Sequence, residues 1–423
     1  MGAMTGRRIA VIGGGISGLT AGYLLAWTDD VTLFEADGRL GGHADTHLVT
    51  PAAGPAIAVD TGFIVYNEHT YPLLTRLFTE LGVNTQAAEM SMSVRCAGCG
   101  LEYAGQRGLG GLAAGVRRGG PRYLRMLAEV PRFHRAAREL LASGRAGDRT
   151  FGEFLADGGY SAYFTAHFAL PLVAAVWSCP PGTALDYPAR YLFAFLANHG
   201  MLSVTGSPQW RTVAGGSARY VERIAKRLHA VRVCSPVRAV HRYSDGVRVG
   251  EVSGEEHRFD AVVIATHPDQ ALELLADPTA AERDVLGAFD YTANPALLHT
   301  DGTLLPRRRA VQASWNYELS DCGSAATTRI SYHMNRLQSL PGGTDYIVTL
   351  GGDGVVDPEH VIDRMDYAHP AYTPASVAAQ RLLPSLSTGV TAFAGAYHGW
   401  GFHEDGCRSG VAAAQALGGS CAL

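Results

Sequence analysis

The sequence predicts an α/β fold in which a parallel sheet is interleaved, along the chain, with a second domain of antiparallel strands and helices. Two short apolar runs, residues 8–12 and 31–34, flank a helical stretch near the N-terminus, as in a β-α-β unit. A further buried-strand pattern lies far along the chain at 261–265, with helical and strand-like periodicity in between. The 423 residues are enough for two or three domains.

The first β-α-β unit carries a Gly-x-Gly-x-x-Gly motif at Gly13, Gly15 and Gly18, directly after the first strand. Gly13 permits the tight turn, Gly15 lets a pyrophosphate approach the backbone, and Gly18 lets the helix pack closely on the strand. The second strand ends on Glu35, where an acid accepts hydrogen bonds from a ribose diol. This unit predicts a Rossmann-like site for a dinucleotide other than NADP, and it leaves NAD and FAD open.

Composition excludes several classes of partner. The formal net charge of −4, without any block of like charge, argues against binding to nucleic acid. No apolar run is long enough for a transmembrane segment. The seven cysteines are odd in number and scattered, which does not indicate a disulfide framework, so we expect a reducing, cytoplasmic environment.

A single Cys-x-x-Cys pair, Cys96 and Cys99, lies between two strand-like runs. No second pair follows at the spacing of a zinc ribbon. We therefore expect a tight turn here, and no metal site in the protein.

The residues after the second strand allow a choice of cofactor. Glu35 begins an E-x-x-x-R-x-G-G segment, and Val-Asp-Thr-Gly-Phe follows at 59–63. The chain resembles the flavin-dependent amine oxidase superfamily in these segments, and nearly its whole length is similar to a bacterial group of amine-oxidase-like flavoproteins. The resemblance implies FAD, with Arg39 paired to a phosphate and Gly41 and Gly42 under the ribityl chain.

His43 stands where many members of the superfamily place a second arginine, which leaves one phosphate contact open. The resemblance also implies a backbone contact between Val237 and the adenine. Motif and resemblance together predict FAD contacts at Gly13, Gly15, Ile16, Ser17, Gly18, Glu35, Ala36, Arg39, Gly41, Gly42, His43, Val237, Gly395, Phe402 and His403.

The resemblance divides the chain into interleaved parts, as in amine oxidases and other flavoproteins of the glutathione-reductase-2 type. The FAD-binding domain is expected from residues 5–75, 205–285 and 388–420. Residues 76–204 are expected to form a mostly helical cap, and residues 286–387 the strands and late helix of the substrate domain.

The segment Gly-Trp-Gly-Phe-His-Glu-Asp-Gly at 399–406 combines two aromatic side chains, an imidazole and two carboxylates. We expect a strand, this turn, and a helix from about residue 406 to 416. In the superfamily this helix N-terminus faces the flavin, so the resemblance places Phe402 on an aromatic wall of the substrate passage and His403 beside the flavin. Asp405 is a candidate helix cap, and the role of Glu404 stays open.

We expect an FAD-dependent oxidoreductase of the desaturase or dehydrogenase type, which removes a hydride from a hydrophobic small molecule or acyl chain. An FAD-dependent double-bond isomerase, an amine oxidase and a non-enzymatic scaffold are the alternatives. Many amine oxidases use a lysine near the flavin, whereas the single lysine here, Lys226, lies in a helical stretch expected to face solvent. The catalytic candidates are Phe402, on the wall of the substrate passage, and His403 and His199. The two histidines are chosen because a histidine suits the role of a base.

Overall fold

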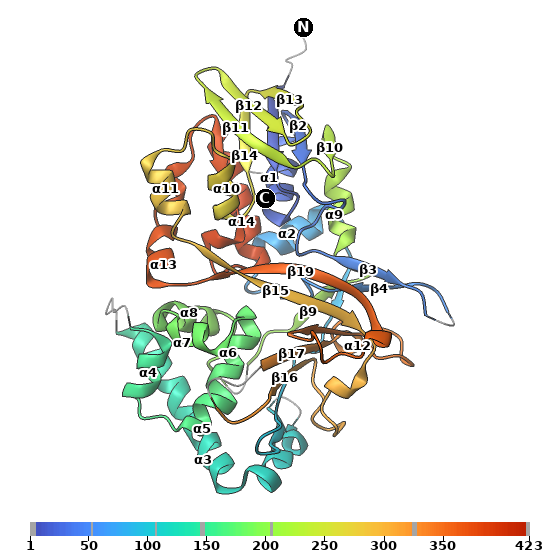
Figure 1. Ribbon diagram of the computed structural model, residues 1–423, viewed down its shortest axis with the longest axis vertical. Helices are drawn as coiled ribbons and strands as arrows, with labels where there is room; N and C mark the ends of the chain where they lie inside the picture. Colours follow the sequence, from blue (N-terminus) through green and yellow to red (C-terminus); the bar gives the residue numbers. More distant parts are fainter. Residues whose placement is uncertain are drawn as a thin grey trace.

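The computed structural model describes residues 6–51, 54–105, 108–143, 149–203, 206–323 and 328–419. It confirms the predicted α/β fold. Figure 1 shows an upper part built around the N-terminal strands and a lower part of helices and strands, with β15 and β19 running between them.

The upper part is built on a five-stranded parallel sheet whose strands come from three separate stretches of the chain. The strand order is β10-β2-β1-β14-β20, and all four pairings are parallel. The strands are β1 (Arg8–Ile12), β2 (Asp30–Phe34), β10 (Ala230–Arg232), β14 (Ala261–Ile264) and β20 (Thr391–Phe393). The apolar side chains of β1, β2, β14 and β20 are buried on both faces, which explains why these strands read as apolar runs, whereas Val231 on the edge strand β10 is exposed.

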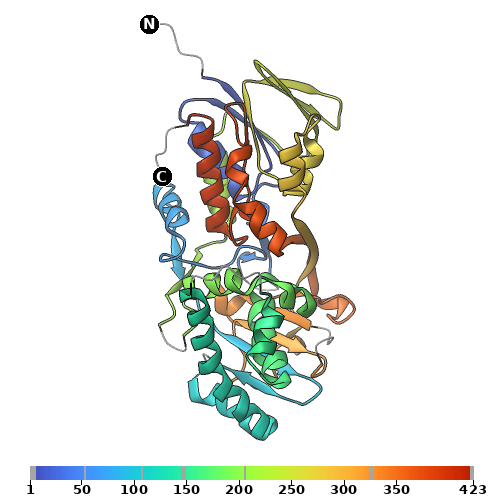
Figure 2. The same cartoon turned by 90° about the vertical axis from the view of Figure 1, so that its left-hand side faces the viewer.

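Helices and small sheets cover this parallel sheet. Figure 2 shows α14 in red on the side where α1, in blue, lies against it. The helices are α1 (Ile16–Leu25), α2 (Pro72–Glu80), α9 (Ala218–Ala225), α10 (Pro268–Leu274), α11 (Ala280–Leu286), α13 (Pro374–Gln380) and α14 (His403–Ala416). The added strands are β3 (Thr46–Val49), β4 (Ile57–Asp60), β11 (Val237–Tyr243), β12 (Gly246–Glu251) and β13 (Glu256–Phe259).

The lower part contains a seven-stranded sheet in the order β19-β15-β18-β17-β16-β7-β8. The β16–β7 pairing is parallel and the other pairings are antiparallel. The strands are β7 (Met92–Cys96), β8 (Glu102–Ala104), β15 (Asp290–His299), β16 (Trp315–Leu319), β17 (Thr328–His333), β18 (Ile347–Leu350) and β19 (Val361–Ala371), with α12 (Met334–Leu337) after β17. The turn expected at Cys96 and Cys99 is present between β7 and β8.

Helices from residues 108–198 cover one face of this sheet (Figure 1). They are α3 (Gly108–Ala142), α4 (Phe151–Asp157), α5 (Ala162–Phe164), a π-helical turn (Thr165–Ala169), α6 (Leu170–Trp177), α7 (Pro181–Asp186) and α8 (Ala189–Asn198). Their apolar sides and the sheet form one core cluster. Three short strands, β5 (Tyr66–Asn67), β6 (Thr85–Ala87) and β9 (Trp210–Val213), lie where the two parts meet.

The start of helix α14 differs from the one predicted. Helix α14 begins at His403, three residues before the expected start, because the Asp405 carboxylate accepts a hydrogen bond from the Phe402 backbone N–H (3.1 Å) and caps the helix. Within the described ranges, no helix has both the length and the apolar character needed to cross a bilayer.

Candidate functional site

A large cavity of about 1300 Å³ runs from the glycine-rich turn of the parallel sheet to the cap helices. Its walls come from both parts of the molecule. Of the residues predicted from the sequence, it is lined by Gly13, Gly15, Ile16, Ser17, Glu35, Ala36, Arg39, Gly41, Gly42, His43, Val237, Gly395, Phe402 and His403. Gly18 and His199 do not line it.

The glycine-rich turn has the geometry of a dinucleotide cradle. The Gly13 backbone N–H donates to the Phe34 carbonyl (2.9 Å), which holds the start of the turn between β1 and α1 against the end of β2. A Cβ on Gly18 would lie 2.0 Å from the Gly13 carbonyl oxygen, so only a glycine at this position of helix α1 allows such close packing. A Cβ on Gly15 would meet nothing within 4 Å, because this backbone faces the cavity. Gly18 therefore acts by packing, whereas Gly15 leaves room for a ligand.

Glu35 is fixed at one end of the cavity. Its carboxylate accepts hydrogen bonds from the backbone N–H groups of Gly14 (2.7 Å) and Asp37 (3.0 Å). The Ser235 backbone N–H donates to the Glu35 carbonyl (2.8 Å), which brings the start of β11 beside it. Val237 lines the same end, so a carboxylate for a ribose and a strand for a base lie side by side.

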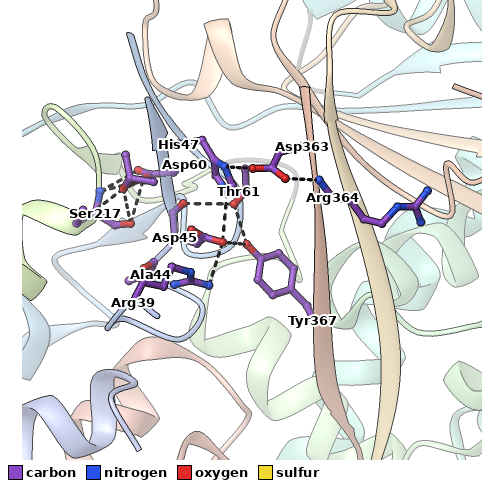
Figure 3. A network of polar contacts seen from close by, with 12 residues as sticks. Arg39, Ala44, Asp45, His47, Asp60, Thr61, Ser217, Asp363, Arg364 and Tyr367 are labelled. Atoms are coloured by element: carbon purple, nitrogen blue, oxygen red, sulfur yellow. Dashed lines mark hydrogen bonds and ion pairs between the residues drawn. The ribbon is translucent and has the colours of Figure 1, made fainter. Parts of the chain in front are cut away.

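Arg39 is held by a buried carboxylate at the middle of the cavity (Figure 3). Its guanidinium lies 3.0 Å from Asp45, which also accepts a hydrogen bond from the Tyr367 hydroxyl (2.9 Å). His47 lies between Asp45 (3.4 Å) and Asp363 (3.0 Å). Burial would raise the pKa of Asp45, but the close contact with His47 and the charge of Arg39 outweigh it and lower the pKa. The carboxylate is therefore ionised and orients Arg39.

Asp60, in the Val-Asp-Thr-Gly-Phe segment, is a buried junction that sequence reasoning did not assign (Figure 3). It accepts hydrogen bonds from Thr46 (2.6 Å), from the backbone and side chain of Ser217 (2.9 Å each) and from Gln338 (2.9 Å). Burial raises its pKa to about 6. The quoted segment was the only signal for it, because two of its partners, Ser217 and Gln338, lie more than 150 residues away in the sequence.

His43 packs inside the cavity wall. Its ring stacks on Tyr367 (4.9 Å between centroids) and lies 5.0 Å from the His369 ring. Burial and the neighbouring histidines lower its pKa well below the usual value, so the ring is neutral. His43 Nε2 has no hydrogen-bond partner in the structure. His43 therefore supplies a neutral ring, and no positive charge, at this position of the cavity lining.

Residues 400–403 of the segment at 399–406 line the cavity where helix α14 begins, and Gly406 in the first turn of α14 packs against Ile16 and Ser17 at the start of α1. The His403 ring stacks on Phe63 (3.7 Å) and its Nε2 lies 3.1 Å from the Tyr220 hydroxyl. Burial lowers the pKa of His403 to about 3, which makes it a poor proton acceptor at neutral pH. The carboxylates point elsewhere: Asp405 caps α14, and Glu404 accepts hydrogen bonds from the first turn of α2.

An aromatic wall faces the cap helices. We use this name for Trp177, Phe195, Trp400 and Phe402. Phe402 stacks on Phe195 (4.6 Å) and contacts Trp177 edge-on (6.2 Å), while the Trp177 indole donates to the Trp400 carbonyl (3.2 Å). The rest of this end is lined mainly by apolar side chains, namely Ile64, Val65, Met90, Ala175, Val176, Met201, Trp210, Trp315, Tyr332 and Leu350.

His199 lies behind the aromatic wall. Its ring stacks on Phe195 (4.0 Å), and its Nδ1 is 3.0 Å from the Phe195 carbonyl oxygen. Burial lowers its pKa to about 4. A residue one layer behind the cavity cannot reach a substrate there, so the structure gives no support to His199 as a base.

Lys226 directly follows the last residue of helix α9. Its side chain is exposed and does not line the cavity.

The cavity fits a dinucleotide that ends in a large flat ring. It supplies a glycine turn and helix N-terminus for a pyrophosphate, a carboxylate for a ribose and a cation at Arg39. A second helix N-terminus, that of α14, lies beside the aromatic wall, where its positive end suits a group that gains negative charge on reduction. These features match FAD, whose flavin supplies hydride-accepting chemistry when bound.

Comparisons with known proteins agree with this geometry. Residues 16–303, more than half of the chain, match the model of the flavin-containing amine oxidoreductases. The chain is 27% identical over 301 residues to coproporphyrinogen III oxidase of Mycobacterium leprae, a match that spans 64% of this chain and 62% of that protein.

Two solved structures share the fold over almost the whole chain. Wild-type putrescine oxidase bound to putrescine has a TM-score of 0.70 at 16% identity, covering 97% of this chain and 98% of that one. A fatty acid isomerase from P. acnes has a TM-score of 0.64 at 16% identity, covering 96% and 97%. The chain belongs to the flavin-containing amine oxidoreductases and is an FAD-dependent oxidoreductase.

Proposed function

We propose that the enzyme removes a hydride from a hydrophobic small molecule or an acyl chain. The observation that carries the proposal is the lining of the cap end of the cavity. The aromatic wall and its apolar neighbours line this part of the cavity, the chamber, whereas the charged side chains of the lining come from other segments, such as Arg39 and Asp45 after β2 and Asp363, Arg364 and Asp366 on β19. Such an apolar lining favours the burial of apolar surface, at about 25 cal/mol per Å².

An amine substrate fits this chamber less well. An ammonium group loses its hydration on entering an apolar site and needs an anionic partner to compensate. Glu404 and Asp405, the nearest carboxylates in sequence to the wall, are already engaged with backbone N–H groups. The single lysine is at the surface, so it cannot serve near the flavin.

Three tryptophans of the chamber lining have buried indole N–H groups. Trp210, Trp315 and Trp400 all line the cavity, and the Nε1 of each is buried without a hydrogen-bond partner in the structure. A buried donor without an acceptor is costly, by about 1–3 kcal/mol. Because these nitrogens are not exposed to the cavity, the indole rings contribute apolar surface to its lining, which suits an apolar substrate.

The test is anaerobic reduction of the bound flavin by a panel of acyl lipids, polyenes and amines. We expect loss of the oxidised flavin absorbance with an apolar acyl or polyene member, and no loss with putrescine or cyclohexylamine. Reduction by amines alone would contradict the proposal. Conversion of a substrate to a positional isomer, with no net reduction of the flavin, would contradict it in favour of an isomerase.

A further inference from the structure

Four side chains with metal-binding atoms meet on the lower part of the molecule, away from the flavin cavity. They are Cys96, Cys99, His167 and Cys322, and their ligand atoms all lie within 4.8 Å of one another. None of the four lines the cavity. We propose that these residues bind a structural zinc ion.

The spacing of the ligand atoms fits a tetrahedral zinc site. Cys96 Sγ lies 3.6 Å from Cys322 Sγ, and Cys99 Sγ lies 3.6 Å from His167 Nε2. With Zn–S near 2.3 Å and Zn–N near 2.0–2.1 Å, tetrahedral angles require S···S of about 3.8 Å and S···N of about 3.6 Å. Three cysteines and one histidine fill all four positions, which is the pattern of a closed, structural site.

Sheet pairing brings the three cysteines together. In the parallel pair of β7 and β16, Cys96 lies opposite Leu319, and the Ala97 backbone N–H donates to the Leu319 carbonyl (2.9 Å). Cys322 follows three residues later. A Cβ on Gly98 would lie only 2.9 Å from the Asp321 Cα, so glycine lets the Cys-x-x-Cys turn approach this loop. The approach brings two segments 226 residues apart into ligand distance.

His167 enters from the cap helices in the orientation of a ligand. It lies in the π-helical turn between α5 and α6, a local distortion that often accompanies functional sites. Its Nδ1 lies 3.0 Å from the Tyr163 carbonyl, which accepts a hydrogen bond only if Nδ1 carries the proton. This leaves the lone pair on Nε2, the atom that faces Cys99. Zinc-bound histidines have such a partner on the second ring nitrogen.

The site joins segments that also form the substrate chamber. Helix α6 runs from the histidine turn to Trp177 on the aromatic wall, and β16 runs from Trp315 towards Cys322. Met90, on the chamber lining, precedes β7, which ends at Cys96. A zinc ion would therefore hold three segments together at one end of each, while the opposite ends of the same segments line the chamber.

Metal analysis of the full chain tests the proposal without any use of enzyme activity. The protein is expressed without a polyhistidine tag in zinc-supplemented medium, and zinc and iron are measured per chain by mass spectrometry. We expect one zinc in the wild type and in the control Cys234→Ser, whose cysteine is exposed and outside the cluster. We expect Cys322→Ser and His167→Gln to lose most of it.

Three results would overturn the proposal: a wild-type chain that holds no zinc and takes up none from added Zn²⁺ under reducing conditions, zinc retained in both variants, or stoichiometric iron instead. Should the variants fail to fold, wild-type protein grown with Co²⁺ decides. Tetrahedral thiolate coordination predicts d–d bands at wavelengths beyond the flavin absorbance, and their absence would overturn the assignment.

Discussion

The carboxylate of Glu404, in the first turn of α14, accepts a hydrogen bond from the backbone N–H of Leu74 in the first turn of α2 (3.0 Å), and a second from the N–H of Leu73 (3.2 Å). A side chain of one helix thus caps another helix more than 300 residues earlier in the chain. The first N–H groups of a helix have no partner within it, so the carboxylate satisfies two of them. Glu404, whose role the sequence left open, is therefore a structural residue.

Replacing Glu404 by alanine should destabilise the fold by about 2 kcal/mol, because two buried N–H groups lose their acceptor. Glu404→Gln keeps an acceptor oxygen and should cost less. Arg408→Ala is the matched control: its guanidinium lies 3.7 Å from Glu404, but its side chain is 56% exposed, so a surface pair of this kind contributes little. Thermal unfolding of the FAD-loaded protein provides the measurement. Equal losses in Glu404→Ala and Arg408→Ala would contradict the capping role.

Phe402→Ala should impair turnover while the FAD stays bound. The ring stacks on Phe195 and lines the chamber, so its loss removes apolar contact with the substrate, whereas the pyrophosphate and ribose contacts lie at the other end of the cavity. A lost contact of about 2 kcal/mol corresponds to a fall of roughly 30-fold in the second-order rate constant for reduction of the flavin by the substrate. Anaerobic stopped-flow reduction measures it, and the flavin spectrum reports retention. Unchanged reduction would mean that Phe402 serves only packing.

Glu35→Ala should weaken FAD binding by roughly 10- to 100-fold, as expected when a charged acceptor of hydrogen bonds is lost. The carboxylate fixes the Gly14 N–H of the cradle and is placed for the ribose. Glu255→Ala is the control, because this carboxylate is 58% exposed and pairs with Arg232 outside the cavity. Titration of deflavinated protein with FAD gives both affinities. Similar affinities in the two variants would show that Glu35 does not contact the cofactor.

The glycine motif, the strands and Glu35 were predictable because their signals are local. The turn, the helix and the acid follow one another within 23 residues, and each has one mechanical role. FAD and the enzyme class followed from the resemblance, and the comparisons confirm both. The start of α14 was missed by three residues, because Asp405 caps it from inside the helix.

Long-range contacts explain what sequence reasoning could not give. Asp60 is identified as a junction only when Ser217 and Gln338 are placed against it. His199 was an attractive base in the sequence, but the fold puts Phe195 between it and the chamber. Likewise, Cys96 and Cys99 gave a visible motif, whereas nothing in the sequence linked them to His167 and Cys322.

The buried His299 should make stability depend on pH. Its Nδ1 accepts a hydrogen bond from the Asp301 backbone N–H (3.1 Å), and its Nε2 lies 2.8 Å from the Thr349 hydroxyl. Burial and the charge of His360 lower its pKa, Asp301 opposes them, and the result is about 4. Below pH 6.5 the unfolded chain binds a proton that the folded chain excludes. The stability from neutral His299 is therefore present above pH 6.5 and is lost as the pH falls towards 4.

The full loss amounts to about 3 kcal/mol for this group. His299→Gln cannot titrate, so the difference in free energy of unfolding between wild type and variant should shrink by up to that amount between pH 7 and pH 4. Taking the difference removes the opposite effect of Asp60 and Asp405, whose pKa values burial raises to about 6 and which are present in both proteins. Denaturant unfolding at the two pH values measures it. A difference that stays constant would mean that His299 is already protonated in the folded protein or does not titrate in this range.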